Sequence, residues 1–224
     1  MPRLARTVIA EVPHHITQRG NRREDVFFAD EDYQAYLEWL QYYSQQHHLE
    51  ILAYCLMTNH IHLVAVPNTE NSLQQVLKPL HMRYAQRINR QKRWKGHFWQ
   101  GRYFSAPLDE PYMWAAIRYV ERNPVRARMV RKAEHYSWSS AASHCGIKDD
   151  GVLSNKTKWK KLTDHVDDWS AWLAEGDAPD ELAVIRRNID KGLPCGTDRF
   201  IRKLEKMIGR SLQFRPQGRP KQEK

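Results

Sequence analysis

The sequence predicts an α+β protein with a ferredoxin-like, split βαβ arrangement, in which helices pack on an antiparallel sheet, followed by a C-terminal helical extension. The first observation is the order of apolar patterns, which is strand, helix, strand, strand, helix, strand, helix over residues 8 to 124. The second is the placement of turn and capping residues between these patterns. In this topology the first and third strands are neighbours at the centre of the sheet.

Four segments have the apolar alternation of strands. The first covers residues 8 to 18 and ends at the turn signal Arg19-Gly20-Asn21. The second and third, residues 49 to 56 and 61 to 66, are joined at Thr58-Asn59. A short fourth strand is expected over residues 103 to 106.

Three segments have helical spacing of apolar residues. One runs from a cap at Asp30 or Asp32 to about residue 46, and a second runs from about residue 72 to 91. A third begins at Asp109 and Pro111, which suit a cap and a first turn, and has to end or kink before Pro124.

The composition is that of a folded protein of a reducing compartment. The chain of 224 residues is 41% hydrophobic and has eight tryptophans. We find neither the roughly 20 apolar residues of a membrane span nor a secretory signal. Three widely spaced cysteines disfavour a disulfide framework and a cysteine-based zinc site. A cytoplasmic, nucleoid-associated protein is expected.

A net charge of +10 points to a polyanionic partner. Between Asn71 and Leu108 there are eight basic residues and no acidic residue, and the basic residues are interleaved with Tyr84, Trp94, Phe98, Trp99 and Tyr103. This pattern is typical of a phosphate-binding track with stacking side chains, although a solvated helix face is the simpler alternative. The candidate DNA-binding residues are Arg19, Arg22, Arg23, Arg83, Arg87, Arg90, Arg93, Lys95, Arg102 and Arg219.

Charge segregation divides the chain into residues 1–146 and an extension, residues 147–224. Residues 163 to 184 have seven acidic and no basic side chains, whereas residues 197 to 224 have nine basic and three acidic ones. Residues 218 to 220, Gly-Arg-Pro, match the core of an AT-hook in a tail expected to be disordered. We hypothesise that the acidic stretch masks a basic face until DNA displaces it.

His60 and His62 are candidate metal ligands. They lie on the third strand, where alternation places both side chains on one face and Ile61 on the other. Two imidazoles on a stiff strand suit a divalent ion, although an isolated His-x-His is more often structural. His14 and His15 alternate faces on the neighbouring strand, and either can be structural, contact phosphate or approach the metal.

Tyr119 and Asn123 are one turn apart on the third helix and share a face. Taken alone, Tyr119 is a half-buried aromatic and Asn123 a helix stop. Combined with the histidines, they suggest DNA strand transfer, in which a tyrosine attacks phosphate and a metal polarises it. Asn123 would then supply the oxygen ligand that completes the metal site.

Three ordered blocks resemble the REP-associated tyrosine transposases, relatives of the single-tyrosine HUH transposases of bacterial insertion sequences. They are residues 13–22, PHHITQRGNR, residues 57–64, MTNHIHLV, and residues 119–127, YVERNPVRA. The resemblance spans about residues 8 to 145, and residues around 209–210 and 218–221 resemble the C-terminal extension of some members.

The resemblance implies a metal-dependent endonuclease and strand transferase acting on single-stranded DNA near palindromic hairpins. His60 and His62 would bind Mg²⁺ or Mn²⁺, and Tyr119 would form a covalent 5′-phosphotyrosine. Asn123 matches a third-ligand position that is often Gln in the insertion-sequence enzymes. Relatives include monomers and dimers, so a monomer or a homodimer is expected.

Two other functions remain open from sequence. A non-catalytic DNA-binding protein or repressor on the same fold would have the same motifs. A ferredoxin-like RNA-binding module is disfavoured, because the second and third strands in the chain offer only Tyr54 as a stacking aromatic.

Overall fold

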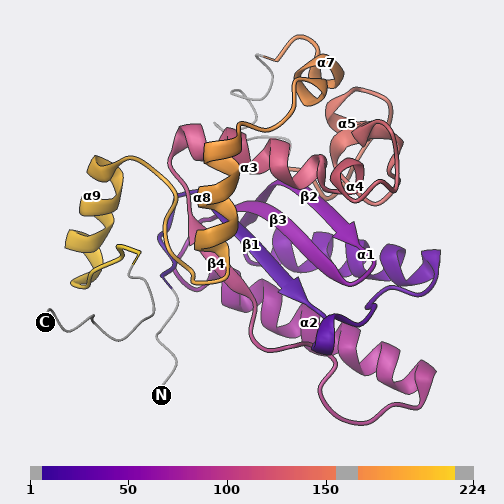
Figure 1. Ribbon diagram of the computed structural model, residues 1–224. Coiled ribbons are helices and arrows are strands. Elements are labelled where there is room, and N and C mark those ends of the chain that lie inside the picture. Colours follow the sequence, from indigo (N-terminus) through magenta and orange to yellow (C-terminus); the bar gives the residue numbers. More distant parts are fainter. Residues whose placement is uncertain (1–6, 155–165, 215–224) are drawn as a thin grey trace, which may run out of the picture.

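A four-stranded antiparallel sheet forms the centre of the molecule. The structure is a computed structural model that describes residues 7–154 and 166–214. The strands lie in the order β2-β3-β1-β4, and β1 and β3 are the central pair (Figure 1). The predicted ferredoxin-like fold is therefore confirmed. The strands are β1 His14–Arg19, β2 Leu49–Met57, β3 His60–Pro67 and β4 Phe104–Pro107.

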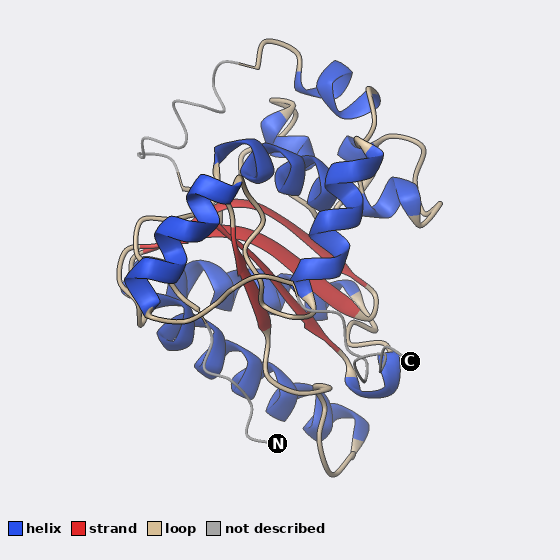
Figure 2. Cartoon of the chain, turned by 60° about the vertical axis from the view of Figure 1, so that its left-hand side comes forward, coloured by secondary structure: helices blue, strands red, loops and turns tan. Residues whose placement is uncertain are grey.

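Helices cover both faces of the sheet, as Figure 2 shows. Helices α1 (Asp30–Gln46) and α2 (Ser72–Lys92) pack on one face, where Ile16, Ile61 and Leu63 are fully buried. Helices α3 (Glu110–Glu121) and α8 (Pro179–Ile189) lie over the other face. None of the described helices has the length and apolar character needed to cross a membrane.

The strand register fixes which side chains reach the α3 face. In the β1–β3 pair, Thr17 lies opposite His62 and Arg19 opposite His60. Paired residues share a face of the sheet, and every second residue follows them. His15, His60 and His62 therefore face α3, whereas Ile16 and Ile61 face α1 and α2.

The first strand starts later than the sequence predicts. Residues 8 to 13 precede β1 as a turn, in which Glu11 has a left-handed φ of 61° and its N–H donates to the carbonyl of Pro67. Pro13 has no N–H to contribute to a strand ladder. The pairing with β3 and β4 therefore begins at His14.

The third helix ends where Pro124 requires it to end. Asp109 caps its start by accepting a hydrogen bond from the Tyr112 N–H. After Glu121 the chain bends at Arg122 into the single turn α4 (Asn123–Arg126), with Pro124 in its first turn. The connecting short helices are η1 Asn21–Arg23, η2 Ala133–His135 and α5 Ala141–His144.

Residues 166 to 214 of the extension pack on the sheet domain at two places. Helix α7 (Trp169–Ala174) and α8 contribute Trp169, Leu173 and Ile185 to the apolar cluster around α3. Helix α9 (Asp198–Ile208) lies apart from them, where Leu204 packs with Ile9 and Leu212 (Figure 1). Residues 166 to 214 thus contact both ends of the sheet domain.

Candidate active site

The His-x-His pair lies in a protected position under α3. The ring centroids of His60 and His62 are 4.9 Å apart, and the ring planes are at 85°. Burial, together with a smaller effect of the positive charge of Arg19, lowers the pKa of His60 to about 4. Burial also lowers the pKa of His62, with His60 and His15 adding to the effect. Both rings are therefore neutral at pH 7, which is the metal-binding form.

Asn59 fixes the tautomer of His60. The Asn59 side-chain N–H donates to the carbonyl of Arg23 at 3.0 Å, so its oxygen faces His60 and accepts from Nδ1 at 2.6 Å. A neutral imidazole has one N–H. With that proton on Nδ1, the Nε2 lone pair of His60 is available to a ligand.

His15 contacts Nδ1 of His62, as Asn59 contacts Nδ1 of His60. Its Nε2 is 2.9 Å from Nδ1 of His62, and the two rings are stacked with centroids 5.0 Å apart. Burial lowers the pKa of His15 to about 3, so it is neutral and able to accept. When Nδ1 of His62 donates to His15, the Nε2 atom of His62 is also free to bind a metal.

His14 has a structural role and does not face the His-x-His pair. Its Nδ1 donates to the carbonyl of Val12 at 2.7 Å, and its Nε2 accepts from the N–H of Ile9 at 3.3 Å. Both ring nitrogens are thereby used. Of the two histidines that the sequence left open, His15 is the one that faces the His-x-His pair.

Tyr119 lies against these histidines. Its ring makes edge contacts with His15 and His62, at centroid distances of 5.6 and 5.5 Å. Helix α3 holds it there, because Ile117 and Val120 are fully buried against the sheet and leave Tyr119 partly exposed beside them. The structure thus brings the tyrosine and the histidine motif together.

Arg126 covers the tyrosine from α4. Its guanidinium carbon lies 4.1 Å from the ring centroid of Tyr119, a cation–π distance. The same guanidinium donates to the backbone carbonyl of Tyr119 and, at 2.8 Å, to the carboxylate of Asp177 from the extension. Arg126 is therefore fixed on both sides, and its position depends on residues 166 to 214.

Asn123, the predicted third ligand, has an unsatisfied side chain. Its Nδ2 atom is buried and has no hydrogen-bond partner among the described residues. Within residues 7–154 and 166–214, no three His, Cys, Asp or Glu side chains are grouped as a metal site. An ion bound here would rely on His60, His62 and oxygen ligands. In Asn123 the atom able to bind a cation is Oδ1, whereas the unsatisfied Nδ2 can only donate hydrogen bonds.

Family comparison agrees with this geometry. The profile of the IS200-like transposases matches residues 9–123, just over half of the 224 residues. The chain belongs to this family. The matched segment includes the three histidines and Tyr119. No curated protein matches this transposase in sequence.

One solved structure has the same fold. The transposase is similar to a REP-associated tyrosine transposase bound to a REP hairpin, with a TM-score of 0.56 and 14% identity, over 70% of this chain and 100% of the other. A structure assigned as a transposase of Deinococcus radiodurans gives a TM-score of 0.37 at 19% identity, over 57% of this chain and 92% of the other. The family resemblance found in the sequence is confirmed.

The predicted DNA-binding residues of this transposase are spread over several surfaces. Arg19 lies beside the histidine pair, Arg22 and Arg23 are exposed in η1, and Arg102 is exposed just before β4. The predicted DNA-binding residues of α2 lie on the opposite side of the sheet from Tyr119. There Arg83 stacks on Trp39 at 4.4 Å and the Arg87 Nε atom is 3.7 Å from the carboxylate of Asp32. Arg90 is exposed on α2, Arg93 and Lys95 follow it, and Arg219 lies outside the described residues.

Sequence reasoning missed the residues that support the site. Asn59 comes directly before His60 in the chain, and this position could have indicated from the sequence that it supports the motif. Asp177 has no such signal, because only the fold brings it to Arg126 and to within 3.5 Å of Arg122. Glu121 is fully buried and accepts from His144, Ser140 and Trp169, which ties α3 to α5 and α7.

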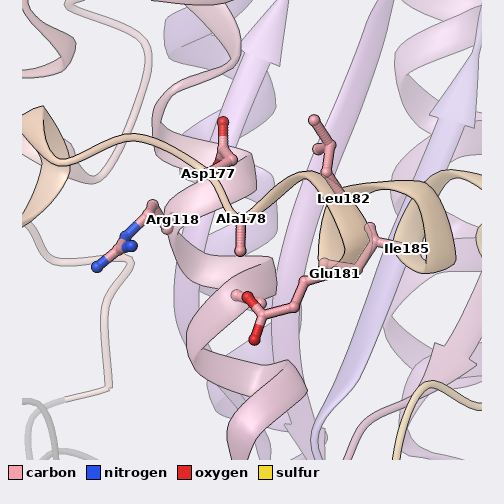
Figure 3. Close-up of a pocket in the computed structure, with 7 residues that line it drawn as sticks. Arg118, Asp177, Ala178, Glu181, Leu182 and Ile185 are labelled. Atoms are coloured by element: carbon pink, nitrogen blue, oxygen red, sulfur yellow. The ribbon is translucent and has the colours of Figure 1, made fainter.

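The seam between α3 and α8 is packed and is no ligand site. Figure 3 shows it, with Arg118 on one side and Glu181, Leu182 and Ile185 on the other. The cavity there is about 10 Å³, which is room for about one water molecule. The seam therefore has no room for a nucleotide.

Proposed function

We propose that this transposase cleaves and rejoins single-stranded DNA at or near palindromic hairpins, with Tyr119 as the nucleophile. The observation that supports it most is the contact of the Tyr119 ring with His15 and His62. It places a potential nucleophile beside two neutral imidazoles in one chain. Because a single chain supplies all these groups, we expect a monomer to be sufficient for cleavage.

The reaction is a transesterification. The phenolic oxygen of Tyr119 attacks the scissile phosphorus, and the bond between phosphorus and the 3′ oxygen breaks. The phenol proton is released, the leaving oxygen takes up a proton to become a 3′-OH, and the 5′ phosphate stays on the tyrosine. Rejoining reverses these steps, and the retained phosphoester makes an external energy source unnecessary.

A divalent cation, Mg²⁺ or Mn²⁺, fits this proposal. The Nε2 atoms of His60 and His62 and the carboxamide of Asn123 would hold it, and when bound it would withdraw charge from the scissile phosphate. Two imidazole nitrogens without a carboxylate suit Mn²⁺ better than Mg²⁺, which prefers oxygen ligands. Asn59 and His15 keep the two Nε2 atoms unprotonated.

The hairpin as substrate rests on the solved relative and on charge. The similar REP-associated transposase is bound to a REP hairpin. This chain has a net charge of +10, Arg19 lies on the histidine side of the sheet, and Arg22 and Arg23 are exposed in η1, which follows β1. Such a surface favours a nucleic-acid backbone.

The test is a denaturing gel of the protein with a labelled pool of single-stranded hairpins, in Mn²⁺ or in EDTA. We expect a metal-dependent protein–DNA adduct that disappears in Tyr119→Phe, while hairpin binding persists. An adduct that survives in Tyr119→Phe would exclude this tyrosine. A mixture of Tyr119→Phe and His62→Ala proteins should form no adduct if each chain works alone.

The alternative is a DNA-binding protein or repressor that uses the same fold without cleavage. Its supporting observation is that the described residues contain no group of three His, Cys, Asp or Glu side chains arranged to hold a metal ion. Hairpin binding that is unchanged by EDTA, with no adduct at any Mn²⁺ concentration, would favour this function.

A further inference from the structure

A basic groove crosses the edge of the sheet beside β4, and we call it the edge groove. Its larger part is a cavity of about 550 Å³ between Arg19, residues 100 to 105, residues 191 to 193 and residues 210 to 212. A second cavity of about 410 Å³ continues toward α2 and shares Gln18, Gly101, Arg102 and Tyr103 with the first. The groove thus leads from the histidine face of the sheet around its edge.

The walls of the edge groove have one sign of charge. Its basic residues are Arg19, Lys78, Arg102, Lys191 and Arg210, and none of the described Asp or Glu residues lines either cavity. Arg19, Lys78 and Arg102 take part in none of the salt bridges within residues 7–154 and 166–214. Unpaired cations facing one groove attract a polyanion such as a phosphodiester chain.

An aromatic side chain is exposed in the same groove. Phe104, the first residue of β4, lies in its wall with 42% of its surface exposed. On the α2 side, the ring of Trp99 is held in place by its Nε1 hydrogen bond to the His81 carbonyl at 2.8 Å. Aromatic faces beside cations bind unpaired bases by stacking, whereas a duplex keeps its base faces covered.

The extension builds one wall of the edge groove and is attached to β4. The Cys195 N–H donates to the Pro107 carbonyl at 2.8 Å, and the Asp109 N–H donates to the Cys195 carbonyl at 3.1 Å. Gly192, with φ of 64°, lies so close that an added Cβ would be 3.3 Å from the Ser105 carbonyl oxygen. Lys191 is therefore held at a fixed place beside the sheet.

We propose that the edge groove holds the single-stranded DNA that adjoins the cleaved phosphate, and that the extension contributes to its binding through Lys191 and Arg210. Arg19 connects the groove to the active site, because it lies opposite His60 in the β1–β3 register. This inference rests on the proposed function for its substrate and adds where the strand lies and what part of the extension contacts it.

The test measures binding of two labelled hairpins by fluorescence anisotropy. One is blunt, and the other has a short oligothymidine extension, placed on either side in turn. In Lys191→Glu and in Phe104→Ala, we expect the Kd for the extended hairpin to rise roughly tenfold and the Kd for the blunt hairpin to stay unchanged. Lys203→Glu makes the same charge change on an exposed residue of α9 outside the groove, and should leave both values unchanged.

Unchanged affinity for the extended hairpin, or an equal loss for the blunt one, would overturn the inference. A second measurement needs no variant. Photocrosslinking of 5-iodouracil in the extension should label the wild-type protein in residues 99 to 105 or 191 to 193, and labelling only on α1 or the outer face of α2 would contradict the groove. Groove-dependent binding without a Tyr119 adduct would reject the cleavage reaction and keep the groove. A Tyr119 adduct together with binding that does not depend on the groove residues would keep the cleavage reaction and reject the groove.

Discussion

The two faces of one sheet differ in what they bury. On the α1–α2 side, buried tyrosine hydroxyls are paired: that of Tyr84 donates to the Val26 carbonyl at 2.7 Å, and that of Tyr36 lies 3.0 Å from Nε2 of His81. Ser44 Oγ is a buried atom on this side without a hydrogen-bond partner among the described residues. On the α3 side, three histidines lie under a tyrosine, and Nδ2 of Asn123 and Oδ1 of Asp177 are buried without hydrogen-bond partners. The first face contributes buried apolar area to the fold, and the second holds the groups that we propose for catalysis.

Strand alternation makes this division possible. His62 and Leu63 are neighbours in β3, yet one faces Tyr119 and the other is fully buried against α1 and α2. The same holds for His15 and Ile16 in β1. Adjacent residues therefore act as probes of stability on one face and of function on the other.

We expect the largest effects from separate substitutions of two adjacent β3 residues, one on each face of the sheet. Leu63→Ala leaves a cavity under α1 and α2 and should lower the free energy of unfolding by roughly 2–5 kcal/mol, with Mn²⁺ binding retained. His62→Leu should abolish Mn²⁺ binding and leave the stability equal or higher, because an apolar side chain replaces a desolvated imidazole. Urea unfolding measures the stability of each variant, and Mn²⁺ titration followed by EPR measures its metal binding. Unfolding of His62→Leu with a stable Leu63→Ala would reverse the assignment of the two faces.

His14 should make stability depend on pH. Burial lowers its pKa from 6.5 to about 4, so the unfolded chain takes up a proton that the folded one does not. The contribution of His14 to the free energy of unfolding is fully present above pH 6.5. It falls by about 3 kcal/mol as the pH decreases toward 4. A proton on Nε2 would also oppose the N–H of Ile9, which that atom now accepts.

The measurement for His14 is urea unfolding at several pH values, comparing wild type with His14→Gln. The variant is expected to be less stable at pH 7 and to lose less stability between pH 6.5 and 4. Identical pH slopes in the two proteins would mean that His14 is protonated in the folded state.

Much of this organisation could be predicted from sequence, because it depends on local periodicity. Apolar spacing gave the order of the elements, and alternation placed His60 and His62 on one face. The role of His15 could not be decided, since it depends on the β1–β3 register, which places Thr17 opposite His62. Asp177 could not be found either. Its contact with Arg126 depends on the packing of α7 and α8 on α3, which no local pattern encodes.

His15 offers a smaller and more specific effect on the functional face. His15→Phe keeps a ring of similar size but removes the acceptor for Nδ1 of His62, so Mn²⁺ affinity should fall about 10- to 100-fold. His15→Gln, whose carbonyl oxygen can accept the same hydrogen bond, should restore part of it. Long-range ¹H–¹⁵N NMR of the metal-free protein should find the His62 proton on Nδ1 in the wild type. A proton on Nε2 there, or equal affinity in both variants, would rule out this role.

The smallest effect tests whether the acidic stretch masks basic residues. In the described part of that stretch, Glu175 lies 3.1 Å from the guanidinium of Arg118, and Asp177 pairs with Arg122 and Arg126. The carboxylates thus neutralise arginines next to Tyr119 and not those of α2. Deleting everything after residue 146 is a poor test, because Trp169, Leu173 and Ile185 belong to the apolar cluster around α3.

Asp177→Asn is the sharper change, because it removes the charge and keeps the shape. If masking operates, the freed guanidinium groups should strengthen single-stranded DNA binding a few-fold at low salt, and the gain should shrink at high salt. Asp180→Asn is the matched control, since Asp180 lies in the first turn of α8 and forms no salt bridge among the described residues. Weaker binding or a lost adduct in Asp177→Asn would instead show that Asp177 positions Arg126 over Tyr119, which makes the extension a part of the active site.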